Sequence, residues 1–133
     1  MLHRVASVAA GHRLTIRSLD VDPRALAIHG AARHLGLELD QPPAVADVVF
    51  VDGELDADGR RRLHAVLVDP LLQQGSWEAP NGDGVEVTYL PGVTDADADA
   101  VVHTADQLGL AVDGAATGRR IEFPPGTDPR VAD

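Results

Sequence analysis

The 133-residue sequence contains no cysteine and no lysine, and its aromatic residues are limited to one Trp, one Tyr and two Phe. The absence of cysteine excludes disulfides, thiolate metal sites and cysteine nucleophiles. Because aromatic side chains are scarce, the core must be built from Ala, Val, Leu and Ile. Apolar residues make up 44% of the chain, which is enough for the core of one compact domain or of two small joined halves.

Positive charge is also scarce. All 11 basic residues are arginines, they face 21 acidic residues, and the formal net charge is −10. The one basic cluster runs from Arg60 to Arg62, directly after Glu54, Asp56 and Asp58. Since binding to a nucleic-acid backbone requires clustered positive charge, we expect no nucleic-acid partner.

Long apolar runs are missing as well. The sequence has no 18-residue apolar run, and its start lacks the continuous apolar segment of a signal peptide. We therefore expect no membrane partner and a cytoplasmic location.

One pattern that is present is an internal duplication. The segment from Leu14 to Leu37 and the segment from Glu86 to Leu110 each read as strand, Asp at the turn, helix, and Leu-Gly-Leu. A constant offset of 73 residues relates them without a gap, which indicates two repeats. This offset maps Asp22 to Asp95, Leu35 to Leu108, Gly36 to Gly109, Leu37 to Leu110, Val48 to Ile121 and Phe50 to Phe123.

Helix signals recur at matching places in both segments. Asp22 and Asp95 are suited to cap a helix by accepting backbone N–H bonds, and Pro23 suits a first helical position. Gly36 and Gly109 stand where each helix must end, because glycine adopts the left-handed conformation of a helix terminus at little cost. The sequence therefore predicts one helix after each aspartate.

The remaining elements complete two repeats of unequal length. In each repeat we expect a second strand after a polar loop, over Asp47 to Val51 in the first repeat and over Arg119 to Phe123 in the second. Between the repeats we expect a helix capped by Asp56 or Asp58 and a strand in QQGSWEA (residues 73–79). The first nine residues could add an edge strand. The repeats are residues 1–80 and 81–123, and residues 124–133 read as a disordered tail. The predicted fold class is α+β, a pseudo-dimer with one antiparallel sheet and helices packed on one face.

Arg119 and Arg120 are the candidate ligand-binding residues, since paired guanidinium groups can hold a carboxylate or a phosphate. Solvent-exposed arginines at a strand edge are the more common reason for such a pair. We expect no metal site, because zinc ligands on one helix stand three or four residues apart, whereas His29 and His34 are five apart. The six histidines are scattered at positions 3, 12, 29, 34, 64 and 103.

The run of alternating aspartates at Asp95, Asp97 and Asp99 resembles the start of a calcium loop. An EF-hand also needs Gly at the sixth position and Glu at the twelfth, where this chain has Ala100 and Asp106. Acidic residues at a helix N-terminus explain the run better. We expect no cofactor, and the sequence contains no phosphate loop, nucleophile elbow or dinucleotide-binding fingerprint.

Two stretches resemble a known family. VEVTYLPGVTDADADAVVHTADQLGL followed by GRRIEF, and the upstream RRRLHAVLVDPLLQQGSWEAP, are similar to the PurS-like N-terminal domain of phosphoribosylformylglycinamidine synthases and to the separate PurS subunit. The resemblance covers nearly the whole chain, from about Leu14 to Phe123. In that family the N-terminal domain is itself like two fused PurS subunits.

The resemblance implies a non-catalytic accessory role in purine biosynthesis, bridging a PurL-like synthetase and a PurQ-like glutaminase, with no activity expected of the chain alone. No catalytic residue of the family carries over. A separate two-repeat chain matches neither known arrangement, so a fragment of a longer synthase and a subunit of a related pathway both stay open, as does homodimerisation. The alternative function is a small-ligand regulatory module with its site between the repeats; a free-standing enzyme ranks last.

Overall fold

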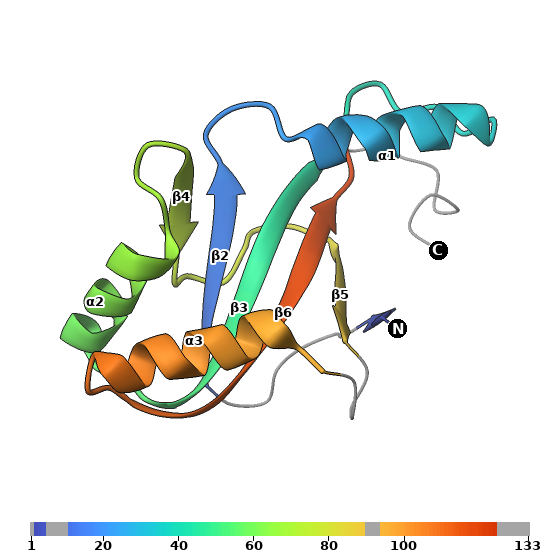
Figure 1. Cartoon of the computed structure of the whole chain (residues 1–133). Helices are drawn as coiled ribbons and strands as arrows, with labels where there is room; N and C mark the ends of the chain where they lie inside the picture. The colour runs from blue at the N-terminus through green and yellow to red at the C-terminus, as the bar shows by residue number, and fades with distance from the viewer. Residues whose placement is uncertain (1, 5–10, 90–93, 125–133) are drawn as a thin grey trace.

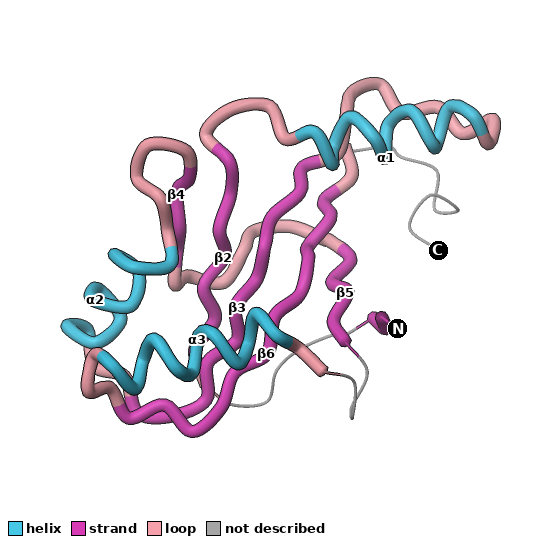
Figure 2. The backbone as a smooth tube through the Cα atoms, in the orientation of Figure 1, coloured by secondary structure: helices cyan, strands magenta, loops and turns pink. Residues whose placement is uncertain are grey.

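The computed structural model describes residues 2–4, 11–89 and 94–124, which form one six-stranded antiparallel sheet and three helices (Figures 1 and 2). The strand order is β1-β5-β6-β3-β2-β4. The elements, in chain order, are β1 (Leu2–Arg4), β2 (His12–Ser18), α1 (Pro23–His34), β3 (Ala44–Glu54), α2 (Ala57–Leu67), β4 (Gln73–Ser76), β5 (Val85–Tyr89), α3 (Ala96–Gln107) and β6 (Ala111–Glu122). The predicted α+β class with an antiparallel sheet is confirmed. None of the helices in these ranges is long and apolar enough to span a membrane.

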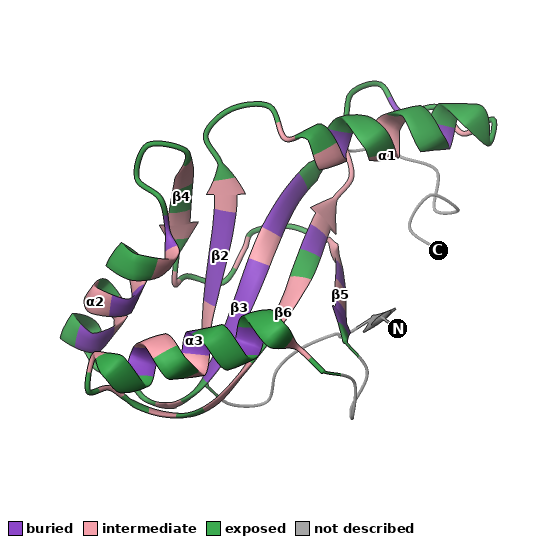
Figure 3. Cartoon of the chain, in the orientation of Figure 1, coloured by how far each residue is buried: buried purple, intermediate pink, exposed green. Residues whose placement is uncertain are grey.

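The main core lies between one face of the sheet and helices α2 and α3. Leu14 and Val49 on neighbouring strands share this core with Leu63 of α2 and with Val101 and Ala105 of α3. Helix α1 differs, because it extends beyond the sheet and is largely exposed (Figures 1 and 3). The helix-side face is therefore covered at one end and partly open at the other.

Both predicted N-caps are confirmed. The carboxylate of Asp22 accepts from the backbone N–H of Arg24, and that of Asp95 accepts from the N–H of Ala98 at 2.9 Å. Gly36 and Gly109 follow the C-caps with φ angles of 78° and 73°, a conformation that favours glycine. Equivalent hydrogen bonds close the two helices, from Leu37 N to Ala32 O at 2.8 Å and from Leu110 N to Ala105 O at 3.0 Å.

Helices α1 and α3 each contain 12 residues, and their bounds differ by 73 positions. The buried alanines Ala25 and Ala32 of α1 stand at the same offset from Ala98 and Ala105 of α3. The longest ladder of the sheet joins β3 to β6, the strands that follow these helices.

Three predicted boundaries are wrong. β6 begins at Ala111, where the sequence pointed to a polar loop, because it pairs with the whole length of β3 through a register shift after Asp52. β3 likewise extends beyond the predicted five residues at both ends, and β4 ends at Ser76. The start of β6 is rich in Gly and Ala and shows little apolar alternation, so it forms a strand because it pairs with β3 and not because of its own sequence pattern. The predicted tail lies outside the described residues except for Pro124.

The two ends of the sheet are unequal. β4 pairs with the outer edge of β2, and β1 pairs with the outer edge of β5, which confirms an edge strand near the N-terminus. Helix α2 leads into β4 on its side, whereas β1 has no helix beside it among the described residues.

Candidate functional site

A cluster of charged side chains lies on the sheet face opposite α2 and α3. Glu86 of β5, which is 4% exposed, accepts hydrogen bonds from Arg13 of β2 and from Arg120 of β6. The Arg13 Nη1 to Oε1 distance is 3.0 Å, and the Arg120 Nη1 to Oε2 distance is 2.9 Å. One carboxylate therefore links three strands.

The cluster continues toward the strand ends. Glu122 accepts from Arg120 Nε at 3.2 Å and pairs with Arg17 Nη1 at 2.6 Å. The Arg13 guanidinium also lies 5.4 Å from the centre of the Phe50 ring, close enough for a cation–π contact. Three arginines and two glutamates thus form one connected network.

Burial by itself raises the pKa of Glu86, but the hydrogen bonds from Arg13 and Arg120 outweigh it, and the pKa lies below its usual value. Glu86 therefore stays ionised at neutral pH. A carboxylate that is charged at neutral pH and bonded through both oxygens is suited to holding strands together and poorly suited to proton transfer at that pH.

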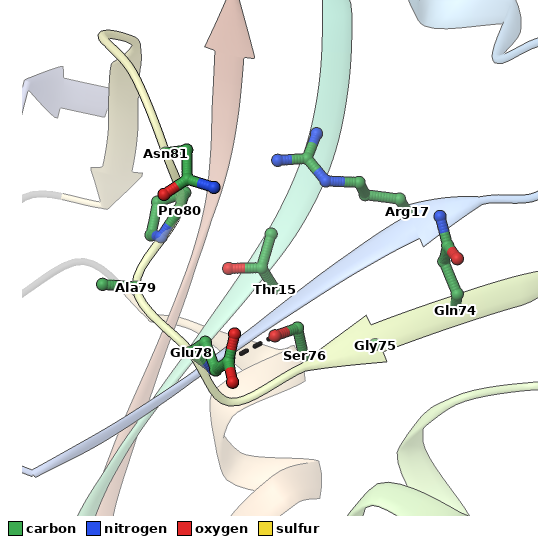
Figure 4. Close-up of a pocket in the computed structure, with 9 residues that line it drawn as sticks. All are labelled: Thr15, Arg17, Gln74, Gly75, Ser76, Glu78, Ala79, Pro80 and Asn81. Atoms are coloured by element: carbon green, nitrogen blue, oxygen red, sulfur yellow. Dashed lines mark hydrogen bonds between the residues drawn. The ribbon is translucent and has the colours of Figure 1, made fainter.

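The segment over residues 77–84 crosses this face from β4 to β5 (Figure 1), and Arg120 Nη2 donates to its Gly82 carbonyl at 2.9 Å. Under this crossing segment lies a cavity of about 320 Å³, toward which Thr15 and Arg17 extend from β2 (Figure 4). Thr15 is 4% exposed, and its Oγ1 has no hydrogen-bond partner among the described residues. The cavity is lined by Thr15, Arg17, Gln74, Gly75, Ser76, Glu78, Ala79, Pro80 and Asn81.

A second hollow lies on the helix-side face, in the part of the sheet that α2 and α3 leave open. This groove of about 710 Å³ has an apolar floor that includes Val49, Val87 and Ile121, with Arg119 and Asp47 among its polar lining residues. Its mixture of apolar and charged residues is typical of a surface that contacts another molecule.

A smaller ionic group stands beside this groove. Arg24 of α1 donates to Asp47 Oδ1 at 2.7 Å and to Asp22 Oδ2 at 2.8 Å. The hydrogen bond from Arg24 lowers the pKa of Asp22, and the charge of Arg119 contributes to the same shift. The group thereby fixes the start of α1 to the end of β3.

The two predicted ligand-binding residues do not form one site. Arg119 and Arg120 are consecutive in β6, so their side chains lie on opposite faces of the sheet. Arg119 is exposed in the helix-side groove, whereas Arg120 is 6% exposed and bonded to Glu86, Glu122 and Gly82. Both are paired with β3, near the Ala44–Glu122 end of the β3–β6 ladder.

Other residues that stand out in the sequence have structural partners. Three histidines face backbone carbonyls, with His12 near Gly53 O, His29 near Leu39 O and His64 near Gly75 O. In the arginine run, Arg61 pairs with Asp58, and Arg62 donates to Leu108 O at 2.8 Å. Across the described ranges, no group of three or more His, Asp or Glu side chains is placed to hold a metal.

Sequence reasoning missed the charged face itself. The signal was present in β2, where Arg13, Thr15 and Arg17 alternate with Leu14 and Ile16, so that one strand face carries polar residues only. The carboxylates that pair with Arg13 and Arg17, those of Glu86 and Glu122, lie more than 70 residues away along the chain, which no local pattern can show.

Part of the chain is similar in sequence to a known protein. Barbiturase 1 from a Nocardioides species is 36% identical to this chain over 86 residues. The match covers 64% of this chain and 22% of barbiturase 1, so the chain corresponds to about a fifth of that relative. No family model and no solved structure matches.

Proposed function

We propose that this chain is a non-catalytic assembly module of an amidotransferase complex similar to phosphoribosylformylglycinamidine synthase, built from two PurS-like units that share one sheet. The observation that carries the proposal is the constant 73-residue offset between β2-α1-β3 and β5-α3-β6, which extends to both helix bounds, both caps and the buried alanines. Two fused PurS-like units are what the family resemblance implies.

The central ladder supports a twofold relation between the units. Ala46 pairs with Arg120 and Asp47 pairs with Arg119. At an offset of 73, Ala46 corresponds to Arg119 and Asp47 to Arg120, so the two pairs exchange under a twofold axis. In a PurS-like unit that pairs with itself, the same ladder would form between subunits.

The charges favour assembly over catalysis. Glu86 and Glu122 are bonded to arginines, and the low pKa of Glu86 keeps it ionised. By contrast, the groove of about 710 Å³ on the helix-side face presents apolar side chains where the sheet is partly uncovered. Such a surface is suited to contact a partner that contributes the chemistry.

The similarity to barbiturase 1 offers a different assignment, in which this chain is one unit of a hydrolase of that kind. The matched region is 22% of barbiturase 1, so this match does not carry over the activity of the whole relative. Barbiturate hydrolysis by the chain alone therefore serves as a control assay.

The test is co-purification of the tagged chain from its native host, at moderate salt with glutamine, Mg²⁺ and ADP, with an equally acidic, unrelated tagged protein as control. Specific recovery of a synthetase and a glutaminase would support the assignment. Recovery of neither, or measurable barbiturate hydrolysis by the chain alone, would contradict it.

A second candidate is a small-ligand regulatory module, favoured by the cavity beneath residues 77–84. Arg17 provides a cation, and Gln74 and Asn81 provide amide groups, in this cavity, which suits a small carboxylate. Thermal shift with a panel of small carboxylic acids tests it. A saturable shift that Arg17→Met removes and Arg61→Met retains would support a ligand site, and no shift would exclude this candidate.

A further inference from the structure

Helix α2 occupies a defined seat between β2 of the first unit and α3 of the second. Its Leu63, which is 0% exposed, shares a core with Leu14 of β2 and Val101 of α3. At the end of α3, Leu108 packs against the same core, and its carbonyl accepts a hydrogen bond of 2.8 Å from Arg62 of α2. A leucine on the inner face and an arginine at the helix end thus hold α2 in place.

The corresponding positions, on α1 of the first unit and β5 of the second, are all more exposed than their counterparts. At the offset of 73, Val87 corresponds to Leu14, Ile28 to Val101 and Leu35 to Leu108. Leu35 is 75% exposed, although Leu108 is partly buried, and Tyr89 is 41% exposed where its counterpart Ile16 is 7% exposed. We call Ile28, Leu35, Val87 and Tyr89 the α1–β5 seat.

The strand that accompanies such a helix is already supplied. β1 (Leu2–Arg4) pairs with β5 at the edge that corresponds to the pairing of β4 with β2. Both β2 and β5 therefore have an outer strand paired with them, and of these two outer strands it is β4 that follows directly after a packed helix, α2. A helix alone would complete the arrangement.

We propose that the α1–β5 seat docks an amphipathic helix of a partner chain, with leucines on its inner face and an arginine that reaches the Leu35 carbonyl. This inference rests on the two-unit organisation in the proposed function. The counterpart of this helix is α2, which places Leu63 on its inner face and Arg62 at the carbonyl of Leu108, the counterpart of Leu35. A second copy is a poorer occupant, because its own α2 is held by the fully buried Leu63.

The chain itself provides the probe, since α2 has the required chemistry and its own seat is filled in the folded protein. A fluorescent peptide with the sequence of residues 54–74 is titrated with the full chain, and binding is followed by anisotropy. Saturable binding with one peptide per chain is expected. Leu35→Asp should weaken it about tenfold or more, the loss typical of a lost buried anchor. Leu71→Asp, at a residue 85% exposed outside the seat, should leave it unchanged.

Peptide variants sharpen the result. A peptide with Leu63→Asp should not bind, and one with Arg62→Glu should bind more weakly. No saturable binding, or binding indifferent to Leu35→Asp in a chain whose circular dichroism is unchanged, would overturn the proposal. Self-association that Leu35→Asp abolishes would instead identify a second copy as the occupant and also overturn it.

The two proposals can fail separately. If the peptide binds but no synthetase or glutaminase is recovered with the chain, the seat stands and the complex assignment falls. If both enzymes are recovered and the peptide does not bind, the docking helix falls and the assignment stands.

Discussion

Arg13 and Glu86 stand at corresponding positions of the two 73-residue-related segments, and their side chains meet across β3 and β6. Glu86→Gln is expected to lower the free energy of unfolding by about 3 kcal/mol, since Arg13 would keep its charge without its Glu86 counter-ion and Arg120 would keep only its pair with Glu122. Urea denaturation measures the loss. The control is Glu38→Gln at an exposed position, expected to stay within about 0.5 kcal/mol; equal effects would show that the network contributes little.

The same carboxylate predicts a pH dependence. Its pKa lies below the ordinary value of 4.5, so the unfolded chain binds a proton more readily than the folded one. The contribution of Glu86 to stability is therefore complete above this value and disappears as pH falls from 4.5 through the lower folded pKa. Thermal unfolding from about pH 7 to about pH 3 should show a smaller loss for Glu86→Gln than for the original chain; parallel curves would contradict this assignment.

The sequence predicted what depends on local signals. Asp22 and Asp95 as caps, the glycines that end the helices, and the order of helices and strands follow from residue chemistry within a few positions. The long β6 was missed, because pairing with β3 gives its Gly- and Ala-rich start a strand conformation.

Long-range placement could not be predicted in this way. The proposed pairing of Arg119 with Arg120 treated sequence neighbours as spatial neighbours, whereas a strand turns consecutive side chains to opposite faces. The Glu86 network and the Thr15 cavity depend on strand order, which the alternation in β2 does not encode.

The two helix caps should differ in strength. Asp95 accepts from Ala98 N and also from the N–H and hydroxyl of Thr117 at 2.8 Å, so it joins α3 to β6. Asp95→Ala is expected to cost about 2 kcal/mol, and Asp22→Ala about 1 kcal/mol. Asp97→Ala, at an exposed first-turn position, should cost only a few tenths of a kcal/mol. Equal losses for Asp22 and Asp95, measured by urea denaturation, would refute the stronger role of Asp95.

Gly30 offers a stabilising substitution. It lies inside α1, and an added Cβ would meet no atom within 4 Å. Gly30→Ala should therefore raise the free energy of unfolding by about 0.5–1 kcal/mol, since alanine favours the helix and restricts the unfolded chain. The comparison is Gly118→Ala, where the Cβ would lie 2.7 Å from Val87 O and should lower the melting temperature. No gain from Gly30→Ala would indicate that α1 is not helical there in solution.

Thr15 tests whether the cavity beneath residues 77–84 holds anything in the free protein. Its hydroxyl is buried and finds no hydrogen-bond partner within the described ranges, so it carries the cost of desolvation without a compensating bond. Thr15→Val keeps the side-chain shape and removes that hydroxyl, and is expected to leave stability unchanged or raise it by up to about 1 kcal/mol. Thr15→Ser, which keeps the hydroxyl and loses a methyl group, should instead be destabilising by about 1 kcal/mol. If Thr15→Val proves the more harmful of the two, the hydroxyl must bond to a water or ligand inside the cavity, and the small-ligand function gains its first direct support.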